Sequence, residues 1–285
     1  MSPPQTPISQ PAGIDVFVLT RFSILSEKQR HSWGIFESRL QTQVRKLLKR
    51  PKTPPTIAEK RAYLFDPERL KYRLFTFETF TLKSLANQVD QNFRHLVCTS
   101  DELPPETRAG LDALATRYRF EIIEVDRKTL FTKKLAALPE FNNLQTDYVA
   151  TMRLDDDDAI GRNAIGTIRA LVPCQHTDFV LSWPKGLFLT DVGDRRYQTR
   201  RSNKPSLTCG MTRIRKGTSI HPTVHGTGNH KYVADSFPFL TLPDEDAYLM
   251  TNHADNISRR SRRDPGRPLT GDTRDLPKRE FGVTL

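Results

Sequence analysis

Short runs of apolar residues recur through the first two thirds of this chain, and each ends in a polar break. The runs are rich in β-branched and aromatic residues, which are typical of buried strands. They lie at 14–19, 93–98, 120–125, 147–154 and 178–183. The pattern predicts five strands, each buried in a sheet.

Between these runs, apolar positions recur every three or four residues, as on one face of a helix. The three sets are Leu74, Phe77, Thr81, Leu85 and Val89; then Leu111, Leu114, Ala115 and Tyr118; then Ala164, Ile165, Ile168 and Leu171. Pro104 and Pro105 suit the first turn of the second helix, and Asn92 ends the first. Alternating strands and helices predict an α/β fold: a mostly parallel, Rossmann-like sheet flanked by helices.

Ligands of such sheets bind at the carboxyl ends of the strands. Three polar clusters fall there: Thr20-Arg21, Ser100-Asp101 and the run Asp155-Asp156-Asp157-Asp158. The last third of the chain is less regular and has no internal repeat. We therefore expect one domain over 14–258, with an exposed basic excursion at about 39–61. Residues 1–13 and the basic tail at 259–285 are expected to be disordered.

The chain has 285 residues and a formal net charge of +11, which favours polyanionic or phosphorylated partners. Its three cysteines, Cys98, Cys174 and Cys209, are odd in number and widely spaced, which fits a reducing cytosol. Residues 1–13 do not resemble a secretory signal, and no apolar stretch is long enough to cross a bilayer. We expect a cytoplasmic protein that makes at most peripheral contact with the anionic inner face of a membrane.

The aspartate run is the main candidate for chemistry. Four adjacent carboxylates repel one another, and a divalent cation would remove much of that cost. Mg²⁺ takes one or two carboxylates together with substrate phosphates, and residues i and i+2 of a tight turn can direct two carboxylates to one ion. The alternative is an exposed acidic turn in which Asp158 caps the following helix.

Several of these segments together resemble a known family. They are TRFS at 20–23, RLFTFETFTL at 73–82, SLANQ at 84–88 and RLDDDD at 153–158. They resemble the putative rhamnosyltransferase family, which is similar to bacterial inverting glycosyltransferases of the GT-A type. HADNI at 253–257 resembles that family's closing His-x-x-Asn segment. The resemblance covers most of the chain from Ile14 to about Ser258.

The resemblance implies a GT-A-like fold, a nucleotide-diphosphate-sugar donor, a divalent metal (Mn²⁺ or Mg²⁺) and a hydroxyl acceptor on a glycan or lipid. Asp155 and Asp157 match the D-x-D metal pair, with Asp156 as the alternative because the fourfold run leaves the register open. Thr20 and Arg21 match the first nucleotide-contacting loop, and Asp101 matches an acidic residue placed against the nucleobase. The long insertion between Ser23 and Leu70 departs from the family pattern.

The irregular C-terminal region is expected to form the acceptor side of the site. An inverting transferase needs a carboxylate that takes the acceptor's proton. Asp244, Glu245 and Asp246 are the candidates, with Asp246 favoured; the alternative is a solvated acidic loop.

Five further residues have candidate roles. His253 would bind the metal or the diphosphate, supported by the nearby Asn256. Arg153 would pair with the aspartates or with phosphate. His225 and His230 belong to the acceptor site or have no role, and Trp183 stacks on a sugar or lies in the core.

Two other functions compete with sugar transfer. A sugar nucleotidyltransferase would also use paired carboxylates and metal, but residues 20–23 lack the glycine-rich phosphate loop expected of it. A nucleic-acid-binding protein would use the basic segments, which have few interleaved aromatic residues to stack on bases. We therefore expect no nucleic-acid partner.

Overall fold

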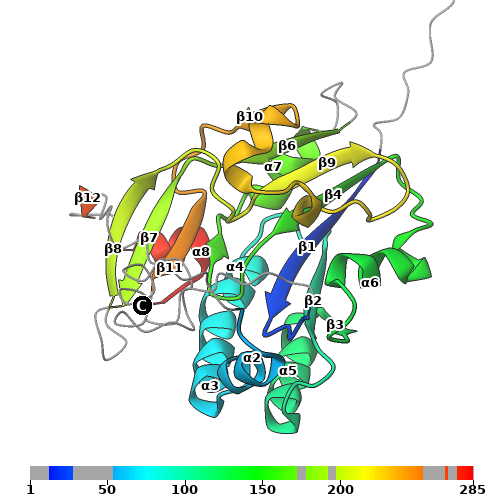
Figure 1. Ribbon diagram of the computed structural model, residues 1–285. Coiled ribbons are helices and arrows are strands. Elements are labelled where there is room, and N and C mark those ends of the chain that lie inside the picture. The colour runs from blue at the N-terminus through cyan, green and yellow to red at the C-terminus, as the bar shows by residue number, and fades with distance from the viewer. Residues whose placement is uncertain are drawn as a thin grey trace, which may run out of the picture.

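The computed structural model (Figure 1) describes residues 13–27, 54–171, 178–191, 197–252, 267–268 and 275–284. The predictions for residues 1–12, for most of the basic excursion, and for Cys174, His253 and Asn256 lie outside these residues.

A seven-stranded sheet forms the centre of the fold. Its spatial order is β10 (Phe239–Thr241), β6 (Asp178–Ser182), β9 (Thr212–Lys216), β4 (Tyr148–Arg153), β1 (Ile14–Phe22), β2 (Arg94–Ser100) and β3 (Glu121–Val125). β3, β2, β1 and β4 run parallel, and β9 runs antiparallel to β4 and β6. The predicted α/β fold with a mostly parallel sheet is confirmed, and all five predicted strands belong to this sheet.

Helices cover both faces of the sheet because side chains along a strand alternate between its faces. Phe17 and Leu19 of β1 pack with α6 (Phe131–Ala137) and the 3-10 turn η3 (Pro139–Phe141). Val16 and Val18 point the other way, toward α7 (Ala164–Ala170). On that second face, Phe22 packs with α3 (Pro67–Thr76) and α5 (Pro105–Tyr118).

The helix predicted from the apolar set Leu74 to Val89 is present, begins at Pro67 and has a π-helical turn inside it. It consists of α3, η2 (Phe77–Leu82) and α4 (Lys83–Ala86). Asp66 starts it by accepting the Arg69 N–H (2.9 Å), and Pro67 occupies its first turn. A short helix, α2 (Ile57–Leu64), precedes it with a Thr56–Glu59 capping box.

A second, five-stranded sheet stands beside the first in Figure 1 and was not predicted. Its order is β12 (Arg267–Pro268), β8 (Tyr197–Asn203), β7 (Lys185–Asp191), β11 (Tyr248–Asn252) and β5 (Ala159–Ile160). The sequence of β8 is YQTRRSN, which lacks the apolar alternation that marks a strand. β8 pairs antiparallel with β7 over seven residue pairs, so pairing rather than local pattern makes it a strand.

The prediction of a disordered tail is wrong for residues 275–284. The helix α8 (Leu276–Phe281) lies behind β11 (red in Figure 1), and Leu276, Phe281 and Val283 are at most 3% exposed. They pack against Phe80 and Leu249, among others. Few apolar residues are present in this basic stretch, but α8 and the residues directly after it turn Leu276, Phe281 and Val283 toward the same core. No helix among the described residues has the length and apolarity required to cross a bilayer.

Replacing Leu276 with Ala tests this docking. We expect the free energy of unfolding to fall by about 2 kcal/mol, at the low end for a buried leucine because a short terminal helix can shift into the cavity. Urea unfolding measures it, with the exposed Lys278→Ala in the same helix as control. A Leu276 variant as stable as the control would mean that α8 does not hold the core in solution.

Candidate functional site

The aspartate run follows β4 directly and lies at the carboxyl edge of the large sheet. β1 and β4 are parallel neighbours, with Leu19 in register with Arg153. Their ends therefore bring Arg21 and Arg153 to the same edge as Asp155. Arg153 donates two hydrogen bonds to Asp155, from Nε to Oδ1 (3.2 Å) and from Nη2 to Oδ2 (2.8 Å), and Arg21 Nη2 lies 3.5 Å from Oδ1.

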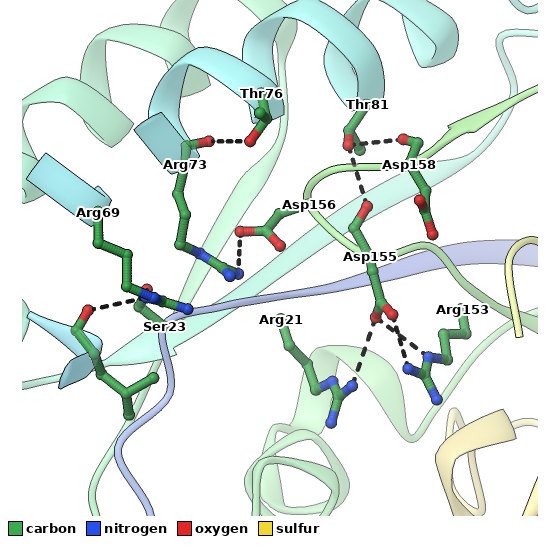
Figure 2. A network of polar contacts seen from close by, with 11 residues as sticks. Arg21, Ser23, Arg69, Arg73, Thr76, Thr81, Arg153, Asp155, Asp156 and Asp158 are labelled. Carbon is green, nitrogen blue, oxygen red and sulfur yellow. Dashed lines mark hydrogen bonds and ion pairs between the residues drawn. The ribbon is translucent and has the colours of Figure 1, made fainter. Parts of the chain in front are cut away.

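Figure 2 shows both guanidinium groups directed at the Asp155 carboxylate. Burial opposes ionisation of this carboxyl, but the charges of Arg153 and Arg21 overcome it and lower the pKa of Asp155. The three side chains are each about one quarter to one third exposed. With the carboxylate ionised, this group of three carries a net charge of +1 and remains open to an anion.

Asp156 points the other way, toward α3. It forms an ion pair with Arg73, and Arg69 lies alongside, donating from Nη1 to the Leu64 carbonyl oxygen (3.2 Å) and to Ser23 Oγ (3.4 Å) (Figure 2). Burial raises the pKa of Asp156 to about 6, against the opposing charge of Arg73.

Asp158 is held by the second sheet. Its Oδ1 accepts the backbone N–H of Thr251 in β11 (3.2 Å), and burial raises its pKa well above the usual value. The Thr81 hydroxyl, in the π-helical turn, lies 3.1 Å from the Asp155 carbonyl oxygen and 2.9 Å from that of Asp158, so it can donate to either (Figure 2). The turn 155–158 is thus fixed by a strand and a helix that are distant in sequence.

These contacts overturn the alternative of an exposed acidic turn. Asp156 and Asp158 are each 3% exposed, and Asn163 rather than Asp158 stands at the start of α7. Arginines from β1, β4 and α3 compensate the charges of Asp155 and Asp156. Of these, the sequence indicated Arg153, whereas Arg21 was expected to contact the nucleotide and Arg73 had no predicted role.

A family model described as "Putative rhamnosyl transferase" matches residues 15–265. The chain belongs to this rhamnosyl transferase family. A search of curated proteins finds no match.

Several solved structures are similar to this chain, a member of the rhamnosyl transferase family, at low sequence identity. Two are of S. aureus TarS, one of them residues 1–349 in complex with UDP. Each is 12% identical with a TM-score of 0.41 over 84% of this chain, which spans 36% and 60% of the two TarS chains. A third, a putative glucose-1-phosphate thymidylyltransferase from Bacillus anthracis, is 10% identical with a TM-score of 0.32, over 81% of this chain and 87% of that one.

Arg21, Asp155 and Arg153 form the charged corner of the site. Two other residues predicted to bind the nucleotide, Thr20 and Asp101, are not part of it. The Thr20 side chain is fully buried, with Oγ1 2.9 Å from His95 Nε2, so only its backbone faces the strand end. Asp101 is exposed in the turn after β2, on the same sheet edge as Arg21, and its backbone N–H is bonded to the Val125 carbonyl oxygen (3.2 Å). Its predicted contact with a nucleobase stays a prediction.

The three candidate bases lie at the start of β11 and have other partners. Asp244 accepts from Trp183 Nε1 (3.2 Å), Glu245 pairs with Lys185, and Asp246 pairs with Arg201 (2.5 Å). Trp183 is buried in the core and has no face free for a sugar. β11 reaches the aspartate run at Thr251, whose N–H bonds to Asp158, and it pairs with β5 directly after the run. The role of these three carboxylates as the acceptor's base stays a prediction.

The fit of a divalent metal rests on two carboxylates. No group of three His, Cys, Asp or Glu side chains within the described ranges could hold a metal ion, and His253 lies outside them. Mg²⁺ in phosphate sites needs only one or two carboxylates, because the substrate supplies the remaining oxygens. Asp155 and Asp157 flank the buried Asp156 and are partly exposed, so they fit such a set.

His225 lies at the charged corner beside Arg21 and Arg153, and the sequence left its role open. Burial, followed by the charges of Arg21 and Arg153, lowers its pKa well below the usual value. A histidine that precedes a glycine in an irregular segment offers no pattern that places it beside β4, so only the folded chain reveals it.

Proposed function

We propose that this chain is a GT-A-like glycosyltransferase that moves a sugar, rhamnose by family, from a nucleotide-diphosphate donor to a hydroxyl of a glycan or lipid-linked acceptor. Membership of the rhamnosyl transferase family supports the reaction class. The single observation that carries the site is the Arg21–Asp155–Arg153 group at the carboxyl edge of a mostly parallel sheet. It combines an excess of positive charge with a carboxylate, which suits a diphosphate that arrives with a cation.

In this proposal Arg21 and Arg153 bind the diphosphate and orient the donor. Asp155 and Asp157 would hold a Mn²⁺ or Mg²⁺ ion, with Asp156 set apart by its pairing with Arg73. The bound ion would supply neutralisation of the negative charge that grows on the leaving diphosphate. The guanidinium groups act on the same charge from the protein side, and they are already held in place by Asp155 before the donor binds.

Transfer with inversion requires a base near the acceptor. The prediction stays with Asp244, Glu245 and Asp246, and Asp246 is favoured because burial raises its pKa and makes it the stronger proton acceptor. The acceptor would then have to reach the start of β11. We also infer a cytoplasmic location, which the free thiols of Cys98 and Cys209 support. Any membrane contact would be peripheral.

A thermal-shift experiment tests the donor site. A matching nucleoside diphosphate with Mn²⁺ or Mg²⁺ is expected to raise Tm by about 5 °C at 100-fold excess over Kd. Metal alone should give a much smaller shift, because Asp155 is already held by two arginines. Asp157→Ala should remove the joint shift without changing the Tm of the free protein.

A panel of nucleoside diphosphates that leaves Tm unchanged in the presence of metal would contradict the donor-site proposal. Slow hydrolysis of nucleotide sugars without acceptor, screened across donors, then identifies the sugar and base.

A further inference from the structure

His225 is fixed at the carboxyl end of β4 by its neighbours. It lies in the 3-10 turn η4 (Val224–Gly226), where the Val224 N–H donates to Thr151 Oγ1 of β4 (2.8 Å). The Thr223 hydroxyl oxygen accepts the His225 N–H (3.3 Å), and Val224 is buried. The edge-on contact with Phe131, at 4.8 Å between ring centroids and 85° between planes, orients the imidazole.

The outer nitrogen of this ring is unsatisfied. Nε2 is shielded from water and has no hydrogen-bond partner in the part of the chain that the structure describes. A neutral imidazole carries one N–H donor and one acceptor, and a buried polar atom without a partner is costly. Burial, and then the charges of Arg21 and Arg153, lower the pKa of His225 well below its usual value, so the ring stays neutral and does not resolve this by gaining a proton. A ligand could supply the missing partner.

The same neighbours indicate the ligand's chemistry. Arg21, Asp155 and Arg153 carry a net charge of +1, and buried Nε of Arg21 also has no partner within the described residues. A group that satisfies both guanidinium and imidazole N–H donors must present several anionic oxygens. A diphosphate does so, whereas a sugar hydroxyl would leave the arginines' charge uncompensated.

We propose that His225 is a diphosphate-binding residue that donates from Nε2 to an oxygen of the donor's diphosphate beside Arg21 and Arg153. This inference rests on the proposed glycosyltransferase function and adds a binding residue to its site. A neutral donor at this place adds a hydrogen bond without a further positive charge beside the two guanidinium groups. The hydrogen bond from Nε2 forms only when the nucleotide binds. Its loss therefore weakens the bound state and leaves the free protein unchanged.

The test compares ligands that do and do not contain phosphate. Isothermal titration of the full chain, with metal, uses the nucleoside diphosphate that the wild-type protein binds best and the corresponding nucleoside. His225→Phe keeps the ring against Phe131 and removes both nitrogens. We expect its Kd for the diphosphate to rise about 10-fold, with no change for the nucleoside and an unchanged Tm without ligand.

Two further variants separate binding from packing. His225→Gln places an amide near the position of Nε2 and should recover part of the affinity, whereas the shorter His225→Asn should lose as much as His225→Phe. The exposed His221, in the same segment, provides the matched control His221→Phe, which should bind as the wild type does. Should His225→Phe fail to fold, the Gln and Asn pair still decides the question.

The outcomes are distinct. If the wild type binds a nucleoside diphosphate and the Phe and Asn variants bind it equally well, the inference is overturned and the proposed function stands. A loss that is equal for the nucleoside and the diphosphate overturns it too, because the histidine would then act through packing. If the wild type binds no nucleoside diphosphate, the inference and the proposed function both fall.

Discussion

Replacing Asp155 with Asn is expected to lower metal-dependent donor cleavage about 100-fold while strengthening metal-free binding of nucleoside diphosphate. Asp155 accepts two hydrogen bonds from Arg153 and lies 3.5 Å from Arg21. Its neutralisation raises the net charge of that group from +1 to +2, which attracts a diphosphate more strongly. It also removes a carboxylate that would hold the metal.

The opposite signs of these two effects make the experiment decisive. Donor hydrolysis with Mn²⁺ and calorimetric binding without metal would be measured on the same preparation. A variant that was merely misfolded would lose both. Asp112→Asn is the matched control, because Asp112 pairs with Arg108 on the exposed side of α5. Retention of metal-dependent cleavage by Asp155→Asn would move the metal to Asp156 and Asp157 or remove it from the mechanism.

Replacing Arg73 with Met should be the most destabilising of these substitutions, by about 4 kcal/mol at pH 8. Asp156 has a side chain only 4% exposed, and Arg73 is its ion-pair partner. Methionine fills much of the space but leaves a buried carboxylate without that partner. Breaking a buried pair from one side costs more than either residue's net contribution, because the remaining charge is still desolvated.

The pH dependence of this effect follows from the Asp156 carboxyl. Its pKa of about 6 lies above the unfolded value, so the folded protein binds more protons than the unfolded chain between about pH 4 and 6. Stability is therefore lost as pH rises through that window. Without Arg73 the pKa rises further, and the deficit should be smaller at pH 5, where the carboxyl can be protonated, than at pH 8.

Urea unfolding at pH 5 and pH 8 measures this difference. The double variant Arg73→Met, Asp156→Asn should recover part of the loss at pH 8, because the buried charge is then gone. Equal deficits at both pH values would show that Arg73 stabilises the fold by packing, for example over the Phe22 ring, and not through Asp156.

The large sheet was predictable because its determinants are local. Each of the five predicted strands and three predicted helices carries its own period of apolar positions, and the order of elements then implies parallel strands. The second sheet was not predictable in this way. β8 is polar throughout and becomes a strand only through its pairing with β7.

The candidate site was likewise predictable only where its determinants are local. The aspartates were visible because they follow an apolar strand, and a parallel sheet places such residues at its ligand-binding edge. Of their partners, only the neighbouring Arg153 was predicted. Arg73 and Asp156 are separated along the chain by α4, α5, α6 and the three strands β2, β3 and β4, and Thr251 reaches Asp158 from β11, 93 residues away.

The sequence by itself determined the alternation of strands and helices, the place of the aspartate run at a sheet edge, and the family resemblance. Only the tertiary structure decided how the charges of that run are compensated, which partners Asp244, Glu245 and Asp246 have, and that His225 lies beside Arg21 and Arg153. The physical reason is that backbone period and burial are set by near neighbours in the chain. Ion pairs and hydrogen bonds between side chains depend on which distant segments the fold brings within a few ångströms.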